Sequence, residues 1–451
     1  MTDLKRIIQK SFVRGWKKGQ GELEPFTIFN LRMDPFAADL PLKDETTYYA
    51  DPNLIADLVG RIGAATKEHF KDETSDGKYN LLLTGPAGVG KSLFAKMTAG
   101  TLSSMEALPG VGKCTSTVID AAMWSHTSIA NEDRRGVANL KAYEEWLSYI
   151  ESNQAPGHQA VKDSAILFID NISLTSGLGL GLPSAERLLQ DLETYSDRKS
   201  LIVGILNTAE LLFLRSQNGD ASVNEFLSAF QPRPLKLPLF SSKAINQMLK
   251  LRLRSVINID NPFSDETLEG IANYSLGLPE LAMKLGRECM LEAVTWNEEK
   301  ISSHIVQKII TDQGFDTALT ILHAESAGKV VEDRRSLFLS RKKLEILRAI
   351  LFNDIRYQFT GNREYRGTTS TQLAETLNRE LSTISYHIRG LTTEWKPHPF
   401  LVSQRDETDS RSTRYFLISP FRNVIELLLE PEYGVKATDQ ISKAVAYAEE
   451  S

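Results

Sequence analysis

The sequence predicts an α/β fold: a doubly wound parallel sheet, followed by a helical lid and a C-terminal winged helix-turn-helix. Three observations carry this prediction. Apolar, strand-like runs alternate with helical segments over residues 51–240, and the first of these runs leads directly into a glycine-rich loop. Two short helices followed by two strands are expected within residues 335–422. Because parallel strands need crossover helices, such alternation favours a sheet with helices on both faces.

Composition bounds the class of protein. At 451 residues, with 41% hydrophobic and 24% charged side chains, the chain is long enough for about three globular domains. Cys114 and Cys289 lie far apart without CxxC spacing, which argues against a disulfide framework or a zinc site. No apolar run approaches the ~18 residues of a membrane span, so we expect a soluble, cytoplasmic protein with no membrane partner.

The segment before the glycine-rich loop is predicted to be helical in two places. Within the lead-in of residues 1–50, residues 1–24 are expected to form a basic amphipathic helix. That helix either docks on the following domain or forms a nucleic-acid arm. Residues 47–70 carry apolar side chains at helical spacing and are expected to lead to the first strand, residues 80–84.

The glycine-rich loop matches the phosphate-binding pattern GxxxxGK[ST]. Its glycines let successive backbone N–H groups point at phosphates, and the helix that follows presents its partly positive N-terminus to the same anion. Lys91 is expected to reach the β- and γ-phosphates, and Ser92 to ligate Mg²⁺. The residues expected to bind the nucleotide are Gly85, Pro86, Ala87, Gly88, Val89, Gly90, Lys91, Ser92 and Leu93.

Three further strands are predicted over residues 115–120, 165–170 and 200–206. The second of them is continuously apolar, as in a strand covered on both faces, and it ends in Asp170. Asp170 is expected to hold Mg²⁺ through water at the carboxyl edge of the sheet. Asn207, after the third, is expected either to face the γ-phosphate and the attacking water or to cap the next helix. A last strand is expected over residues 233–239.

The order of phosphate loop, strand ending in Asp170, strand ending in Asn207 and helical lid (residues 241–330) resembles the AAA+ ATPases. Three stretches are similar to the Orc1/Cdc6 branch of that family: Gly204–Thr208, Leu237–Phe240 and Ile245–Arg252. The opening residues Phe29, Asp34, Pro35, Phe36 and Tyr49 resemble ExeA-type and transposition-accessory ATPases. The resemblance covers about residues 26–310. It implies ATP and Mg²⁺ as cofactors and a homo- or hetero-oligomer, for which Arg215 and Arg233 are the candidate trans-acting arginines.

Two residues depart from the family pattern. In this family the Mg²⁺-holding Asp of the second motif is called the Walker B Asp, which here corresponds to Asp170. Relatives that hydrolyse ATP well carry Glu directly after it, where this chain has Asn171. The Asn171 amide can orient water but cannot accept its proton. Glu280 stands where the lid usually carries an arginine, although Lys284 or Arg287 lies one or two turns further along. We therefore expect Asp170, Asn171 and Asn207 to support only slow hydrolysis, with ATP acting mainly as a conformational or assembly ligand.

The C-terminal part of the chain is basic. Between Arg334 and Arg422 there are 16 Lys and Arg against 9 Asp and Glu, although the whole chain has a net charge of −6. An amphipathic helix at 341–353 precedes two short helices at 369–378 and 381–391, which is the helix-turn-helix layout. Two strands at 400–404 and 413–418 would complete a winged helix, and residues 423–451 are expected to form a helix and a tail.

The helix at 382–391 resembles the recognition helix of ArsR-type repressors. We expect Ile384, Ile388 and Leu391 to pack inward while polar side chains face double-stranded DNA and the wing arginines contact phosphate or the minor groove. A winged helix used for protein contacts is the alternative, because the wing tip is acidic. The predicted DNA-binding residues are Ser382, Thr383, Ser385, Tyr386, Arg389, Arg405, Arg411 and Arg414.

These features together predict an ATP-regulated, DNA-binding AAA+ protein that resembles replication initiators and is associated with the nucleoid. Two alternatives remain open. One is a nucleotide-switched transcription regulator. The other is an accessory ATPase of a transposition or defence system, partnered by another DNA-processing protein.

Overall fold

The computed structural model describes residues 29, 31, 34–36, 52–71, 79–104, 115–126, 129, 131–152, 163–195, 200–217, 219–256, 261–296, 298–326, 340–360, 367–394, 399–406 and 412–430. The predicted helix over residues 1–24, Tyr49 and Arg411 lie outside these ranges. The chain divides into two compact units. The first contains residues 53–238 and 339–430, so it combines the α/β domain with the basic C-terminal segment. The second contains residues 1–52, 239–338 and 431–451.

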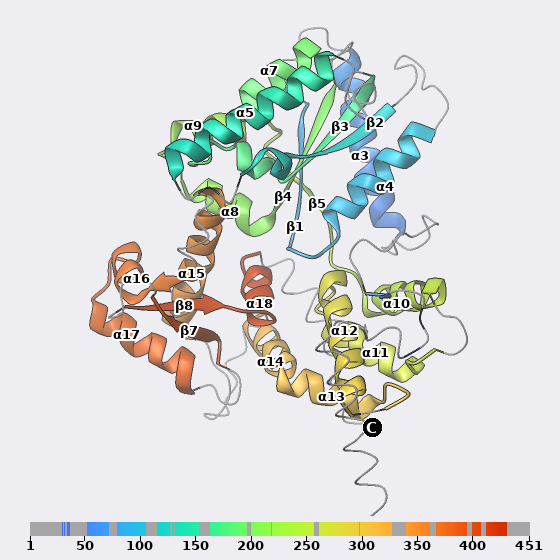
Figure 1. Cartoon of the computed structure of the whole chain (residues 1–451), viewed down its shortest axis with the longest axis vertical. Coiled ribbons are helices and arrows are strands. Elements are labelled where there is room, and N and C mark those ends of the chain that lie inside the picture. Colours follow the sequence, from blue (N-terminus) through green and yellow to red (C-terminus); the bar gives the residue numbers. More distant parts are fainter. Residues whose placement is uncertain are drawn as a thin grey trace, which may run out of the picture. The chain divides into compact units, whose positions relative to one another are not determined.

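Within the described residues of the first unit, five strands form a parallel sheet in the order β2-β3-β4-β1-β5 (Figure 1). Helices α5, α7 and α9 lie on one side of it, and α3 and α4 on the other (Figure 1). The strands are β1 (Leu81–Gly85), β2 (Thr115–Asp120), β3 (Ser164–Asp170), β4 (Leu201–Asn207) and β5 (Leu235–Lys236). The doubly wound parallel sheet predicted from the sequence is confirmed.

The core of the sheet lies along its three central strands. Every residue of β1 is buried, and β3 and β4 are buried up to their last residues, Asp170 and Asn207, which are half-buried. Removing these apolar runs from water on both faces is the main force that holds the sheet together. Because the strands are parallel, the polar residues that end them gather at one edge.

The edge strand β5 is shorter than the sequence predicts. Residues 233–239 were expected to form it, but only Leu235 and Lys236 pair with β1. Pro234 and Pro238 flank this pair, and proline has no backbone N–H to donate to a neighbouring strand.

Helices and short 3₁₀ turns connect the strands. The α-helices are α3 (Pro52–Lys71), α4 (Lys91–Ser104), α5 (Glu132–Glu151), α7 (Ala185–Tyr195), α8 (Thr208–Ser216) and α9 (Ala221–Ser228). The 3₁₀ turns are η2 (Ala121–Trp124), after β2, and η3 (Ile172–Thr175), after β3. Trp124 fixes η2 against α5 through edge contact with Tyr143, with 5.1 Å between ring centroids. The turns that follow the strand ends are therefore held by the core.

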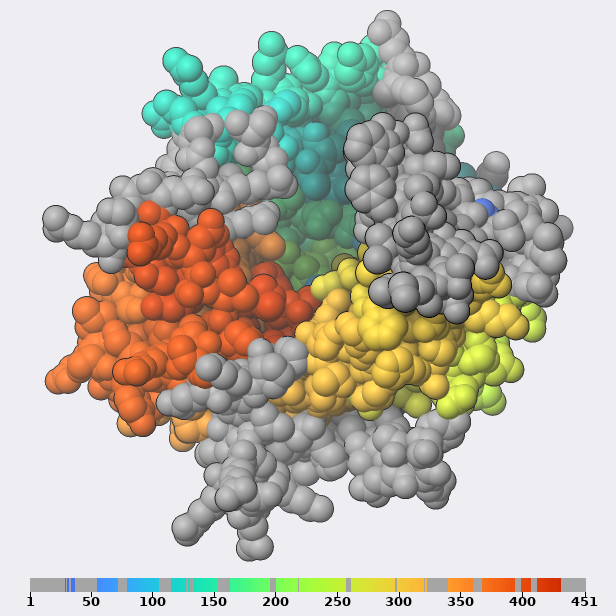
Figure 2. All heavy atoms as spheres, turned by 60° about the horizontal axis from the view of Figure 1, so that its bottom comes forward, coloured from blue at the N-terminus to red at the C-terminus, as the bar shows by residue number. Residues whose placement is uncertain are grey.

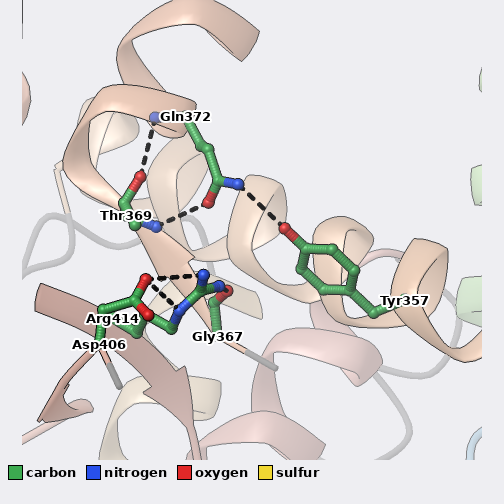
Figure 3. Close-up of polar contacts among 6 residues, drawn as sticks. All are labelled: Tyr357, Gly367, Thr369, Gln372, Asp406 and Arg414. Carbon is green, nitrogen blue, oxygen red and sulfur yellow. Dashed lines mark hydrogen bonds and ion pairs between the residues drawn. The ribbon is translucent and has the colours of Figure 1, made fainter. Parts of the chain in front are cut away.

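The C-terminal part of the same unit combines helices with a small antiparallel sheet of order β6-β8-β7 (Figure 1). Its elements are α15 (Arg341–Thr360), β6 (Thr368–Thr369), α16 (Ser370–Thr376), α17 (Leu381–Arg389), the π-helical turn η5 (Gly390–Glu394), β7 (Leu401–Arg405), β8 (Thr413–Leu417) and α18 (Phe421–Leu428). A capping box between Thr369 and Gln372 starts α16 (Figure 3). The helices α15, α16 and α17 and the strands β7 and β8 follow the order expected from the sequence, whereas β6 was not predicted.

Aromatic packing joins this C-terminal part to the α/β domain. The ring of Phe213 on α8 stacks on Phe359 of α15, with 5.8 Å between centroids, and it also meets Phe352 edge-on at 5.9 Å. Phe359 is 2% exposed and Phe213 is 5% exposed. Burying aromatic surface of this kind contributes about 2 kcal/mol or more per ring to the free energy of unfolding. These contacts therefore stabilise the packing of α15 on α8.

The described part of the second unit is helical. Its helices are α10 (Ser242–Val256), α11 (Asp265–Tyr274), α12 (Pro279–Trp296), α13 (Ser303–Asp312) and α14 (Phe315–Ser326). The stretch 34–36, which the sequence analysis singled out, packs on them. Arg252 Nε donates to Pro35 O at 2.8 Å, and Arg287 Nε lies 3.3 Å from a carboxylate oxygen of Asp34. Among the helices described in either unit, none is long and apolar enough to cross a membrane.

Gly181 gives a test of how closely the segments of the first unit pack. It has φ +65°, and a Cβ built there would overlap the backbone of Gly136 on α5. Gly181→Ala should lower the free energy of unfolding by about 2–4 kcal/mol, because about 1 kcal/mol of left-handed backbone strain adds to about 1–3 kcal/mol of overpacking. Gly60→Ala in α3 is the control: its Cβ would meet nothing within 4 Å. That variant should be more stable than wild type by about 1 kcal/mol. Equal denaturant midpoints for the two variants would contradict this account.

Candidate functional site

The loop between β1 and α4 has the backbone that phosphate binding requires. Gly88 and Gly90 adopt φ of 77° and 97°, a left-handed conformation that side chains disfavour. At Gly85, a Cβ would stand 2.9 Å from Val89 Cγ1 and 3.2 Å from Leu237 O. Helix α4 begins at Lys91, so its N-terminal N–H groups follow directly on the loop.

Lys91 is buried at the centre of this edge, with 8% of its surface exposed. Its ammonium group donates to Gly85 O at 3.0 Å, to Pro86 O at 2.8 Å and to Asn207 Oδ1 at 2.7 Å. Because an ammonium group has three protons, these acceptors match its donors in number. The structure therefore joins the phosphate loop to the end of β4 through one lysine.

Asn207 lies at the N-cap of α8, which is one of the two roles that the sequence left open, and its side chain also reaches the phosphate loop. Its side chain accepts from Lys91, and its backbone N–H donates to Glu210 Oε2 at 2.7 Å at the start of α8. Glu210 is only 8% exposed. Burial raises the pKa of its carboxyl group, against the Asn207 N–H and the Lys91 charge, which lower it. The sequence analysis missed Glu210, although a carboxylate three residues after a helix-capping position is a recognisable capping signal.

The residues after Asp170 form a carboxylate–amide pair with the neighbouring strand. Asp120 pairs in register with Asp170, and its Oδ1 accepts from Asn171 Nδ2 at 2.8 Å. Asn171 has φ 54°, a left-handed conformation that Asn tolerates better than Glu does. The departure from the Walker B pattern thus has a local structural reason. Asp120 was missed as a site residue, because register between strands 50 residues apart cannot be read from the sequence.

A second buried carboxylate reaches the loop from α18. Glu426 is 4% exposed, and its Oε1 accepts from Ala87 N at 3.0 Å. Burial raises the pKa of this carboxyl group, against the charges of Lys91 and Arg422 and the N–H groups of Ala87 and Ala209, which lower it. The contact joins positions 339 residues apart in the sequence, and no local sequence signal indicates it.

The residues at this edge fit a nucleotide and Mg²⁺. The backbone N–H of Ala87 already donates to a carboxyl oxygen, that of Glu426, so this part of the loop can bind an oxygen acceptor. Ser92 follows Lys91 on α4, and Asp170 ends β3, two strands away from β1. Asn171, Asn207 and Glu210 also line a cavity of about 670 Å³. Another cavity, of about 520 Å³, is lined by Asn80 and Ser200 at the opposite edge, away from the phosphate loop.

Helix α17 separates a polar face from an apolar one. Ile384, Ile388 and Leu391 are buried, as the sequence predicts. Ser382, Ser385 and Arg389 are exposed, Thr383 is half-buried, and Tyr386 is 70% exposed. The surface of residues 340–430 is drawn in orange to red in Figure 2. The exposed face therefore presents a tyrosine ring, hydroxyl groups and an arginine, which together can hydrogen-bond and stack with a polar partner.

The arginines of the β7–β8 hairpin differ in their surroundings. Arg405 is exposed at the end of β7. Arg414 is 8% exposed, and its guanidinium contacts Asp406 Oδ2 at 2.7 Å and Gly367 O at 3.3 Å (Figure 3). Asp406 is itself buried, so this pair holds the hairpin to the residue before β6. Arg405 is therefore exposed to solvent, whereas the guanidinium of Arg414 is bonded within the fold.

The remaining arginine candidates lie outside the phosphate-loop cluster. Arg215 at the end of α8 and Arg233 before β5 are both exposed, and Arg215 donates to Pro232 O at 3.3 Å. In the second unit, Glu280 and Lys284 are exposed on α12, and Arg287 forms the ion pair with Asp34 described above.

Comparison with known proteins gives structural similarity only. No family model and no curated protein matches the sequence. The RuvB Holliday junction branch migration motor of Thermotoga maritima has a TM-score of 0.37 and 18% identity, covering 84% of this chain and 95% of that one. Aeropyrum pernix ORC1 in complex with DNA has a TM-score of 0.40 and 15% identity, covering 88% of this chain and 96% of that one. Drosophila ORC bound to DNA has a TM-score of 0.39 and 16% identity, covering 92% of this chain and 92% of that one. These scores are too low to transfer function.

Proposed function

We propose that this chain is an ATP-regulated, DNA-binding AAA+ protein of the Orc1/Cdc6 type, in which nucleotide controls DNA binding or assembly in replication initiation. The observation that carries the proposal is the position of Lys91. It lies at the start of α4, behind a loop with two left-handed glycines, and touches Asn207 at the carboxyl edge of a parallel sheet. In open α/β sheets, this edge is where nucleotides bind.

The nucleotide site of the proposal uses residues of three strand ends. Residues 85–93 would cradle the phosphates of ATP, and Ser92 and Asp170 would hold Mg²⁺. When bound, Mg²⁺ neutralises phosphate charge and orients the terminal phosphate. Asn171 has no base to offer, since an amide does not take a proton from water, and its amide is engaged with Asp120. We therefore propose slow hydrolysis.

The DNA-binding part of the proposal is a winged helix made of α15–α18 and the β6-β8-β7 sheet. The exposed face of α17, with Ser382, Ser385 and Arg389, would enter the major groove. Arg405 on the hairpin would contact phosphate. The excess of positive charge between Arg334 and Arg422 supports a polyanionic partner. Oligomers on DNA, or a second DNA-processing protein, complete the proposal, which places the protein at the nucleoid in the cytoplasm.

Removing the ammonium group of Lys91 tests the nucleotide site. Lys91→Ala should weaken ATP binding by about 2 kcal/mol or more, which is about 30-fold, because charge-assisted hydrogen bonds to phosphate are lost. Isothermal titration calorimetry with ATP and Mg²⁺ measures this. Lys96→Ala, an exposed lysine of the same helix, is the matched control and should bind ATP as wild type does. Unchanged affinity in Lys91→Ala would refute the proposed nucleotide site.

Exchanging the carboxylate and the amide tests the explanation for slow hydrolysis. Asn171→Glu alone would set two carboxylates within hydrogen-bonding distance, so the change is combined with Asp120→Asn, which restores an amide–carboxylate pair. The double variant places a general base beside Asp170 and should hydrolyse ATP at least about 10-fold faster than wild type. Asp120→Asn alone should not show this gain. A phosphate-release assay measures both, and no gain in the double variant would show that position 171 does not limit turnover.

The salt dependence of DNA binding tests the proposed winged helix. Arg389→Ala combined with Arg405→Ala should weaken duplex binding, and loss of the phosphate contact of Arg405 should reduce the slope of log K against log salt by about 1. Fluorescence anisotropy with a duplex at several salt concentrations measures the slope. Arg134→Ala, an exposed arginine on α5, is the control. If the double variant keeps the wild-type slope, the segment is a protein-docking module instead.

A further inference from the structure

Glu426 stands out because its carboxylate lies on the phosphate loop although its helix belongs to the C-terminal segment. Besides Ala87, the backbone N–H of Ala209 at the start of α8 also donates to it. The side chain is almost fully buried. Its contact is therefore a packed feature of the first unit, with donors from the phosphate loop and from α8.

The rest of α18 is anchored around this contact. Phe421, Val424 and Leu427 are buried. At the C-terminal end, Glu430 forms an ion pair with Lys236 on β5, the strand beside β1. At the N-terminal end, Arg422 lies 3.3 Å from a carboxylate oxygen of Asp354 on α15. These contacts aim the Glu426 carboxylate at the loop.

The charges around Lys91 show what the contact does to the site. Glu210 and Glu426 are both buried carboxylates, and the charge of Lys91 acts on each of them. A buried carboxylate is tolerated only where a cation and N–H donors compensate it. A phosphate chain would bring further negative charge to the same lysine and to the same loop N–H groups. Like charges in a low-dielectric site repel strongly, so the phosphates and the Glu426 carboxylate cannot both be well bound there.

We propose that Glu426 is an internal competitor of the phosphates of ATP, so that nucleotide binding releases α18 from the phosphate loop. This inference rests on the proposed function, since it takes ATP as the ligand of the loop. It gives the nucleotide a direct physical route to the basic C-terminal segment. By linkage, the coupling is reciprocal: a partner that draws α18 away from the loop raises the affinity for ATP by the same factor.

The test compares ATP affinity in full-length wild type, Glu426→Gln and Glu426→Ala. Both variants remove the competing charge and should bind ATP about 10-fold more tightly, with the alanine variant at least as tight as the glutamine variant. Glu375→Gln, an exposed carboxylate on α16, is the matched control and should bind as wild type does. Isothermal titration calorimetry with ATP and Mg²⁺ measures all four proteins.

A second measurement needs no variant and covers the case in which a substitution at position 426 impairs folding. Hydrogen exchange of wild type with and without ATP should show faster exchange of the amides of residues 421–428 when ATP is bound, because the helix loses its seat on the loop.

The outcomes separate this inference from the function on which it rests. If wild type binds ATP but Glu426→Gln binds it equally or more weakly, Glu426 supports the nucleotide rather than competing with it, and the inference fails while the proposed function stands. Unchanged exchange of α18 on ATP binding has the same meaning. If wild type and both Glu426 variants all fail to bind ATP, the proposed function fails and the competitor role fails with it.

Discussion

The buried ammonium group of Lys91 is the interaction on which the rest of this edge depends. It is the cation that acts on both Glu210 and Glu426, and it also bonds to the loop carbonyls and to Asn207. Without it, the two buried carboxyl groups would lose the one cation that acts on both, and their pKa values would rise further. The parallel sheet supplies the geometry, because it brings the ends of β1, β3 and β4 to one side. The balance between the Lys91 charge and the two carboxyl groups then determines how well a further anion can bind at this edge.

Local patterns predicted most of the fold. The continuous apolar runs that end in Asp170 and Asn207 gave the central strands, since their length and composition are typical of strands buried on both faces. The alternation of Ile384, Ile388 and Leu391 with polar side chains likewise indicated which face of α17 packs inward. The strand β5 was overestimated most clearly, because prolines near both ends of this two-residue strand limit pairing.

The site was less predictable, because two of its polar residues join it through long-range contacts. The phosphate loop, Asp170 and Asn207 carry their own sequence signals. Asp120 enters through strand register and Glu426 through the docking of α18, and neither leaves a local trace. The same holds for Arg414, whose charge suggests a nucleic-acid contact until its buried partner Asp406 is known. Charge counts describe the surface of a segment well, but they do not show which arginines are used inside it.

The left-handed backbone at Asn171 has a consequence for how this chain can evolve. A Glu at that position meets an unfavourable φ and, at the same time, the carboxylate of Asp120. Asn171→Glu alone would therefore meet two obstacles, and pairing it with Asp120→Asn would remove one of them, so the effects of changes at the two positions are coupled across neighbouring strands. The backbone geometry at position 171 therefore favours the present pair of Asp120 and Asn171. Relatives of the chain should keep or lose Asp120 and Asn171 together.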